Sequence, residues 1–110
     1  MEQLLTIIKE RASSILEEVI IMRRHLHQHP ELSFKEYNTS RYVCDKLSEF
    51  EIEYEAGIVE TGIVALIKGK NPTLKTIALR ADLDALPIFE ENDVDYKSIN
   101  DGVMHACGHD

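Results

Sequence analysis

Two imidazoles, a thiol and a carboxylate fall within the short segment HACGHD, residues 105–110 of the sequence. Thiolate and imidazole are the ligands that zinc and neighbouring divalent metals prefer. Gly108 allows the backbone to turn so that the side chains of Cys107 and His109 can face one ion. The segment therefore predicts Cys107 and His109 as metal ligands, with His105 as a possible further one. Because a zinc-type site needs about four ligands, this segment alone does not complete a site.

A pair of carboxylates follows the apolar stretch 76–79, which is rich in residues that favour β-strands. Residues two apart on a strand face the same way, so Asp82 and Asp84 are expected to project together from its end. There they could bind a metal or hold an imidazole ligand in place. Two other interpretations stay open: solvated acids with Asp82 paired to Arg80, or the diphosphate-metal site of a sugar-nucleotide transferase.

Arginines and histidines cluster at residues 23–29, where an amphipathic helical pattern ends before Pro30. In that helix His25 and His29 share a face and His27 points elsewhere. Since the helix dipole favours cations near a C-terminus, the pattern predicts this structural role over a metal-binding face.

The elements that must position these residues follow from periodicity and turn signals. Helices are predicted from about Glu2 to His29 and, after a capping box of Ser33 and Glu36, down to about Glu49. Strands are predicted at 52–55, 62–67 and 76–79, and residues 86–103 form a long loop. Two helices followed by three strands indicate an α/β fold, with α+β as the alternative.

The composition of the 110 residues is that of one soluble domain, with 44% hydrophobic residues and a formal net charge of −8. The negative charge argues against a nucleic-acid partner. The sequence lacks an apolar run of about 18–20 residues and a secretory signal, so we expect a cytoplasmic protein without a membrane partner. Cys44 and Cys107 are expected to be free thiols, with Cys44 as a small core residue.

Three motifs in order carry a resemblance to a known family: RHLHQHPELSF at 24–34, ALRADLDALPI at 78–88 and HACGHD at 105–110. Together they resemble the amidohydrolase branch of the aminoacylase/carboxypeptidase metallopeptidase superfamily, which includes hippurate hydrolases, N-acyl-amino-acid amidohydrolases and auxin-conjugate hydrolases. The resemblance implies that residues 1–110 are the N-terminal portion of a catalytic domain with a mixed sheet. The rest of that domain and a dimerisation domain have no counterpart in this sequence.

The resemblance also implies two divalent ions in each intact active site, Mn²⁺ or Zn²⁺ foremost and Co²⁺ or Ni²⁺ as alternatives. It assigns Cys107 and His109 as ligands and Asp84 as a residue that orients a metal ligand. Asp82 falls where other branches carry a histidine ligand, so its role stays open beside that of His105. The paired glutamates of the family, one of them the general base, are not in this chain.

The activity implied by the resemblance is metal-dependent hydrolysis of the amide bond of N-acyl amino acids, which releases a carboxylic acid and an amino acid. The intact enzyme is expected to act on small molecules as a homodimer, and the 110-residue chain alone to be inactive. One alternative is a small metal-binding or interaction module that uses Cys107 and His109. The transferase ranks last, because no glycine-rich phosphate loop accompanies a strand.

Overall fold

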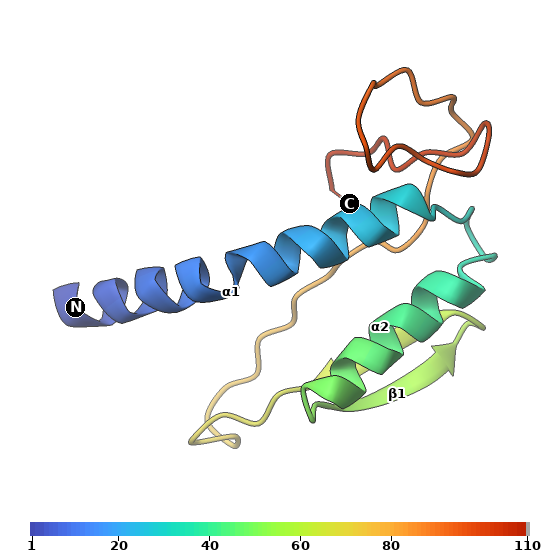
Figure 1. Cartoon of the computed structure of the whole chain (residues 1–110). Coiled ribbons are helices and arrows are strands. Elements are labelled where there is room, and N and C mark those ends of the chain that lie inside the picture. The colour runs from blue at the N-terminus through green and yellow to red at the C-terminus, as the bar shows by residue number, and fades with distance from the viewer. Residues whose placement is uncertain (110) are drawn as a thin grey trace.

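The computed structural model describes residues 1–109, which form two helices followed by two strands (Figure 1). Helix α1 spans Glu2–Gln28 and helix α2 spans Tyr37–Glu49. Strands β1, Glu53–Ile58, and β2, Gly62–Leu66, pair in antiparallel fashion. The order of these elements confirms the predicted α/β class with two helices ahead of the strands.

Helix α1 begins and ends within one residue of the prediction. Its last turn closes where the N–H of His29 donates to the carbonyl oxygens of His25 and Leu26, each at 3.2 Å. Pro30 follows directly and is fully buried, and its ring prevents the helix from continuing. No helix within residues 1–109 is long and apolar enough to cross a bilayer.

The predicted capping box at the start of α2 is wrong. The hydroxyl of Ser33 donates instead to a carboxylate oxygen of Asp84 at 3.0 Å. Helix α2 starts at Tyr37 with Glu36 in the N-cap position, and the Glu36 side chain makes no capping hydrogen bond to the helix. The extra residues 33–36 form a turn, which the sequence spacing does not distinguish from a first helical turn.

The carboxylate of Glu31 caps α2 from outside the helix. Its Oε1 accepts the N–H of Thr39 at 2.6 Å and the Thr39 hydroxyl at 2.7 Å. Its Oε2 accepts the N–H of Asn38 at 3.2 Å and the side-chain amide of the same residue at 3.0 Å. Partial burial raises the pKa of Glu31, but these hydrogen bonds lower it by more than burial raises it. The pKa of Glu31 therefore lies below its ordinary value.

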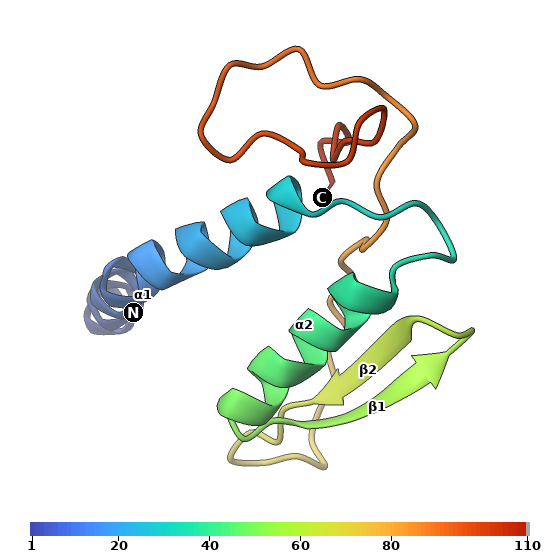
Figure 2. The same ribbon diagram turned by 45° about the vertical axis from the view of Figure 1, so that its right-hand side comes forward.

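The hairpin β1–β2 carries a bulge at Gly57, whose φ is +82°, and a turn in which Val59 and Glu60 also have positive φ. A positive φ is costly for a branched side chain such as valine. Helix α2 packs on both strands (Figure 2), and its N-terminus holds the turn. The buried Thr61 hydroxyl donates to Glu36 at 2.8 Å, and the Tyr37 hydroxyl donates to Glu60 at 3.1 Å.

The predicted third strand at 76–79 is not formed in the part of the chain that the structure describes. Residues 67–84 form a connection without helix or strand, and residues 75–81 of it run extended (Figure 1). Ile77 is 84% and Leu79 is 95% exposed. Apolar, β-favouring residues form a strand only when a neighbouring strand accepts their backbone hydrogen bonds, and residues 1–109 offer none here.

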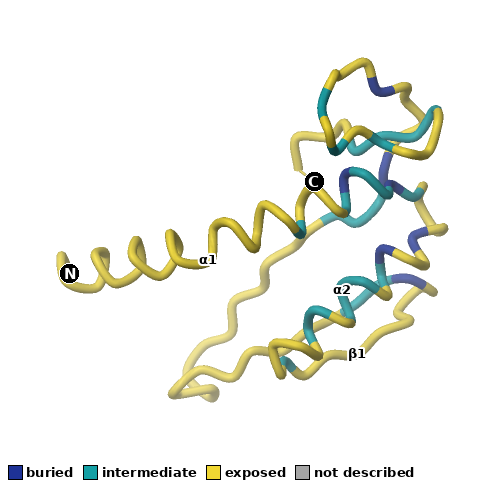
Figure 3. Tube along the Cα trace, viewed as in Figure 1, coloured by how far each residue is buried: buried dark blue, intermediate teal, exposed yellow. Residues whose placement is uncertain are grey.

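The buried residues gather where the C-terminal end of α1 meets the start of α2 and the loop 86–104 (Figure 3). The apolar ones are Ala85 and Pro30. The polar ones are His27, Glu36, Thr39, Thr61 and Glu90. The first twenty residues are exposed on every side of α1. The radius of gyration is 16.3 Å, against about 13 Å for a compact domain of this length.

Candidate metal centre

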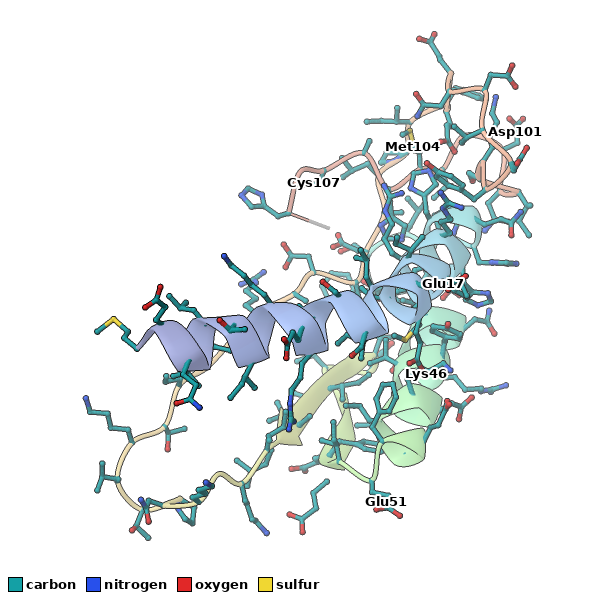
Figure 4. The ribbon with its side chains drawn as sticks, turned by 60° about the vertical axis from the view of Figure 1, so that its left-hand side comes forward. Glu17, Lys46, Glu51, Asp101, Met104 and Cys107 are labelled. Atoms are coloured by element: carbon teal, nitrogen blue, oxygen red, sulfur yellow. The ribbon has the colours of Figure 1, made fainter. Side chains whose placement is uncertain are left out.

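Cys107 and His109 follow a short backbone bridge that fixes the start of their segment. The N–H of Leu86 donates to the carbonyl of Met104 at 2.9 Å, and the N–H of Met104 returns a bond to Leu86 at 3.0 Å. Beyond Met104 the chain runs back beside α1, where Cys107 lies (Figure 4). The bridge therefore sets the direction in which the predicted ligands leave the loop.

The two predicted ligands lie next to each other and are both exposed. The Sγ of Cys107 is 3.5 Å from the Nδ1 of His109. Zinc bound tetrahedrally by one thiolate and one imidazole separates the two ligand atoms by about 3.6 Å. The pair therefore fits one half of such a site. Asp110, the carboxylate of the same motif, lies outside the described residues.

A cavity of about 320 Å³ borders this segment and α1. It brings together Asp82, His105 and Cys107, three of the residues that the sequence singles out. Its wall combines apolar and polar side chains: Val19, Met22, Arg23, Leu26, His27, Thr39, Asp82, Leu83, His105 and Cys107. Within residues 1–109, no group of three or more histidine, cysteine, aspartate or glutamate side chains is arranged to hold a metal ion.

Asp82 and Asp84 do not project together as predicted, because their segment is not a strand. Asp82 accepts hydrogen bonds from the Arg80 guanidinium at 2.8 and 2.9 Å, as in the solvated interpretation, and also lines the cavity. Asp84 is half-buried and accepts the Ser33 hydroxyl instead. The two aspartates therefore have different partners, Arg80 for Asp82 and Ser33 for Asp84.

The histidines of α1 divide as the helical spacing predicts. The rings of His25 and His29 stack at 4.4 Å, and His25 also stacks on Tyr42 of α2 at 4.2 Å. Burial, and then the neighbouring His29, lower the pKa of His25. These contacts confirm a structural role for that face.

His27 points the other way and forms a buried pair with Glu90, which the sequence analysis missed. The Nε2 of His27 lies 2.8 Å from the Oε1 of Glu90, whose side chain is 1% exposed. Burial alone raises the pKa of Glu90, but hydrogen bonds from the Ser98 N–H, His27 and Asn92 lower it to about 2. The partners are 63 positions apart, so no local spacing announces the pair.

Within residues 1–109, neither Cys44 nor Cys107 forms a disulfide, as predicted. Cys44 is half-buried within α2, and Cys107 is exposed. The Cys107 thiol therefore lies at the cavity, whereas Cys44 lies within helix α2.

The cysteine–histidine pair lies beside a cavity in an α/β chain, and comparisons with known proteins show which family the chain resembles. Residues 78–110 match Peptidase family M20/M25/M40. An uncharacterized hydrolase of Staphylococcus haemolyticus is 58% identical over 97 residues, which cover 88% of this chain and 24% of the relative. Thermostable carboxypeptidase 1 of Saccharolobus solfataricus is 48% identical over 104 residues, which cover 94% of this chain and 26% of the relative.

The fold agrees with the same family. The YXEP protein of Bacillus subtilis, described as a dinuclear metal-binding peptidase from the M20 family, superposes with a TM-score of 0.77 at 44% identity. The match covers 88% of this chain and 27% of that chain. These likenesses confirm the resemblance of this chain to the M20 metallopeptidase family. It spans about a quarter of the length of the curated relatives that it matches.

Proposed function

We propose that residues 1–110 are the N-terminal portion of the catalytic domain of an M20 metallohydrolase. In this proposal Cys107 and His109 supply two ligands of a two-metal centre that other parts of the polypeptide complete. The observation that carries it is the 3.5 Å spacing of the two ligand atoms, which is close to the separation that a shared metal requires. The description of the Bacillus subtilis neighbour as dinuclear supports the number of ions.

The reaction that we propose is hydrolysis of the amide bond of an N-acyl amino acid, which gives a carboxylic acid and an amino acid. When bound, divalent ions supply Lewis acidity that polarises an amide carbonyl and makes water more acidic. The role of this chain is to hold those ions through Cys107 and His109 and to shape one wall of the cavity. Asp82 and His105 line that wall, and Asp84, fixed by Ser33, is the proposed orienting residue.

The general base is proposed to lie elsewhere in the full-length protein, since no glutamate of the described residues lines the cavity beside Cys107. A site with mixed sulfur, nitrogen and oxygen ligands suits Mn²⁺ or Zn²⁺, with Co²⁺ and Ni²⁺ as alternatives. We further propose a cytoplasmic homodimer that acts on small-molecule substrates. Because one relative is named a carboxypeptidase, short peptides are the substrates to compare with N-acyl amino acids.

The test replaces both ligands in the full-length protein. Cys107→Ala combined with His109→Ala is expected to remove bound metal and to lower kcat/KM at least about 100-fold, because two ligands of the centre are gone. Metal content is measured by mass spectrometry, and turnover on a panel of N-acyl amino acids and dipeptides. Cys44→Ala, which removes the thiol inside α2, is the control and should keep both. Full metal content and activity in the double variant would refute the proposal.

The chain of 110 residues by itself is expected to be inactive, since it supplies two ligands and no base. A small metal-binding module is the second candidate, because the ligand pair is exposed and already at metal-binding distance. Equilibrium dialysis of this chain with Zn²⁺ separates the two. Weak binding fits part of a larger site, whereas tight binding of one ion per chain favours the module.

A further inference from the structure

Glu90 joins the loop 86–104 to helix α1 through its carboxylate. It accepts hydrogen bonds from His27 of α1 at 2.8 Å, from the N–H of Ser98 at 2.6 Å and from the side chain of Asn92 at 3.2 Å. The side chain of Glu90 is almost completely buried. An acidic group in such a place is stable only if its oxygens are satisfied, and one donor from α1 and two from the loop do so.

The same loop is attached to the C-terminal end of α1 at two further points. The N–H of Ile99 donates to the carbonyl of Gln28 at 3.0 Å, and the side chain of Asn100 donates to the carbonyl of Pro30 at 2.7 Å. Figure 1 shows the loop seated over this end of the helix. The loop therefore moves with α1 as long as these bonds hold.

The segment with the predicted ligands leaves this loop directly. Met104, which closes the loop against Leu86, is followed at once by His105 and then by Cys107. On its other side, the His27 ring lines the same cavity as Cys107 and lies 6.5 Å from the His105 ring. The position of the thiol relative to α1 thus depends on how the loop docks, and Glu90 is the buried centre of that docking.

We propose that Glu90 is a positioning residue for the metal centre, which fixes His27 and loop 86–104 on α1 so that Cys107 faces the cavity. This inference rests on the proposed function, because it assumes that Cys107 binds metal. A purely structural Glu90 would affect thermal stability alone. A positioning Glu90 also affects how well the folded protein binds metal.

The experiment compares Glu90→Gln with Glu91→Gln in the full-length protein. An amide offers one acceptor oxygen in place of two and turns an NH₂ donor toward another donor, so it cannot satisfy the three bonds. Glu91 is the exposed neighbour and serves as the matched control. Zinc affinity is measured by competition with a chromogenic chelator, and the cobalt-loaded protein by its thiolate-to-metal absorption band. All measurements are made well below each variant's own melting temperature.

The expected result is that Glu90→Gln binds zinc about 10- to 100-fold more weakly and loses intensity in the cobalt–thiolate band. Glu91→Gln should behave as the wild type. His27→Gln, whose amide N–H can still donate to Glu90, should bind metal more tightly than His27→Leu. This second pair decides the matter if Glu90→Gln does not fold.

Wild-type affinity and an unchanged band in folded Glu90→Gln would overturn the inference, whatever the melting temperature does. Equal, wild-type affinity in His27→Gln and His27→Leu would overturn it as well. If the cobalt–thiolate band persists in the Cys107→Ala variant, the proposed function is overturned, and this inference with it. The two failures are therefore distinguishable.

Discussion

The helix–hairpin unit, residues 31–66, and two outlying parts of the chain, residues 1–22 of α1 and the connection 67–81, are built from similarly apolar sequence. They differ in packing, because in the unit α2 packs on both strands. In the unit, Glu31 caps α2 and Glu36 holds the hairpin turn, so the strained turn is fixed by partners within 25 residues. The outlying parts leave large apolar side chains exposed, Leu79 at 95% among them. Local sequence suffices for a structure whose partners are local, whereas these apolar faces require partners that residues 1–109 do not supply.

The largest expected effect is on the hairpin. In Gly62→Ala the new Cβ would lie 2.5 Å from the carbonyl oxygen of Ile58, so the turn must shift. We expect the hairpin to lose about 3 kcal/mol of local stability. Amide hydrogen exchange in β1 and β2 measures this change. Gly69→Ala, where nothing lies within 4 Å of the added carbon, is the control and should leave protection unchanged. Equal protection in both variants would contradict the tight turn.

A smaller effect is expected at the helix cap. Glu31→Ala removes four hydrogen bonds from the start of α2 and should lower the stability of that helix by about 2 kcal/mol. Exchange of the Asn38 and Thr39 amides reports it directly. Glu17→Ala, an exposed substitution on α1, is the comparison. Unchanged exchange in the Glu31 variant would show that α2 does not need this cap.

The buried carboxylate predicts a pH dependence of loop docking. The pKa of Glu90 is about 2 in the folded chain against an ordinary 4.5. The free energy that the Glu90 carboxylate adds to the docking of the loop is therefore complete above pH 4.5. It is lost as the pH falls toward 2, at most at about 1.4 kcal/mol per pH unit. Exchange of the Ser98 amide across this range measures it. Glu90→Gln should abolish the slope, and an identical pH profile in that variant would contradict the assignment.

The smallest effect in the 110-residue chain is expected at the exposed segment, where it also tests the comparison between regions. Leu79→Ala should change the stability of this chain by less than about 0.5 kcal/mol, because the side chain contacts solvent. If the rest of a catalytic domain covers this residue, the same change should cost the full-length protein about 2–5 kcal/mol. Denaturant melts of both proteins give the two numbers. A small cost in both would refute coverage of this segment.

How far the sequence predicted the molecule depends on how far apart the interacting residues are. The helix α1 and its end at Pro30 follow from periodicity and a helix-breaking residue, and the separation of His27 from His25 and His29 follows from helical geometry. The start of α2 was misplaced because its cap comes from Glu31, outside the usual capping spacing. The strand at 76–79 was mispredicted because β propensity says nothing about whether a neighbouring strand is present.

The candidate site shows the same division. The types and spacing of Cys107 and His109 predict a metal site, because ligand chemistry resides in the residues themselves, and this stays a prediction. Only the folded chain separates Asp82 from Asp84 and places Asp82 with Cys107 at one cavity.

The sequence by itself determined helix α1, the presence of α2, the strands of the hairpin and the family resemblance, since these depend on periodicity, turn residues and side-chain chemistry read over short spans. The tertiary structure alone decided that Glu90 and His27 share a buried hydrogen bond across 63 positions. The physical reason is that a buried charge needs donors wherever the chain can bring them, and the linear order of residues does not record which distant donors arrive.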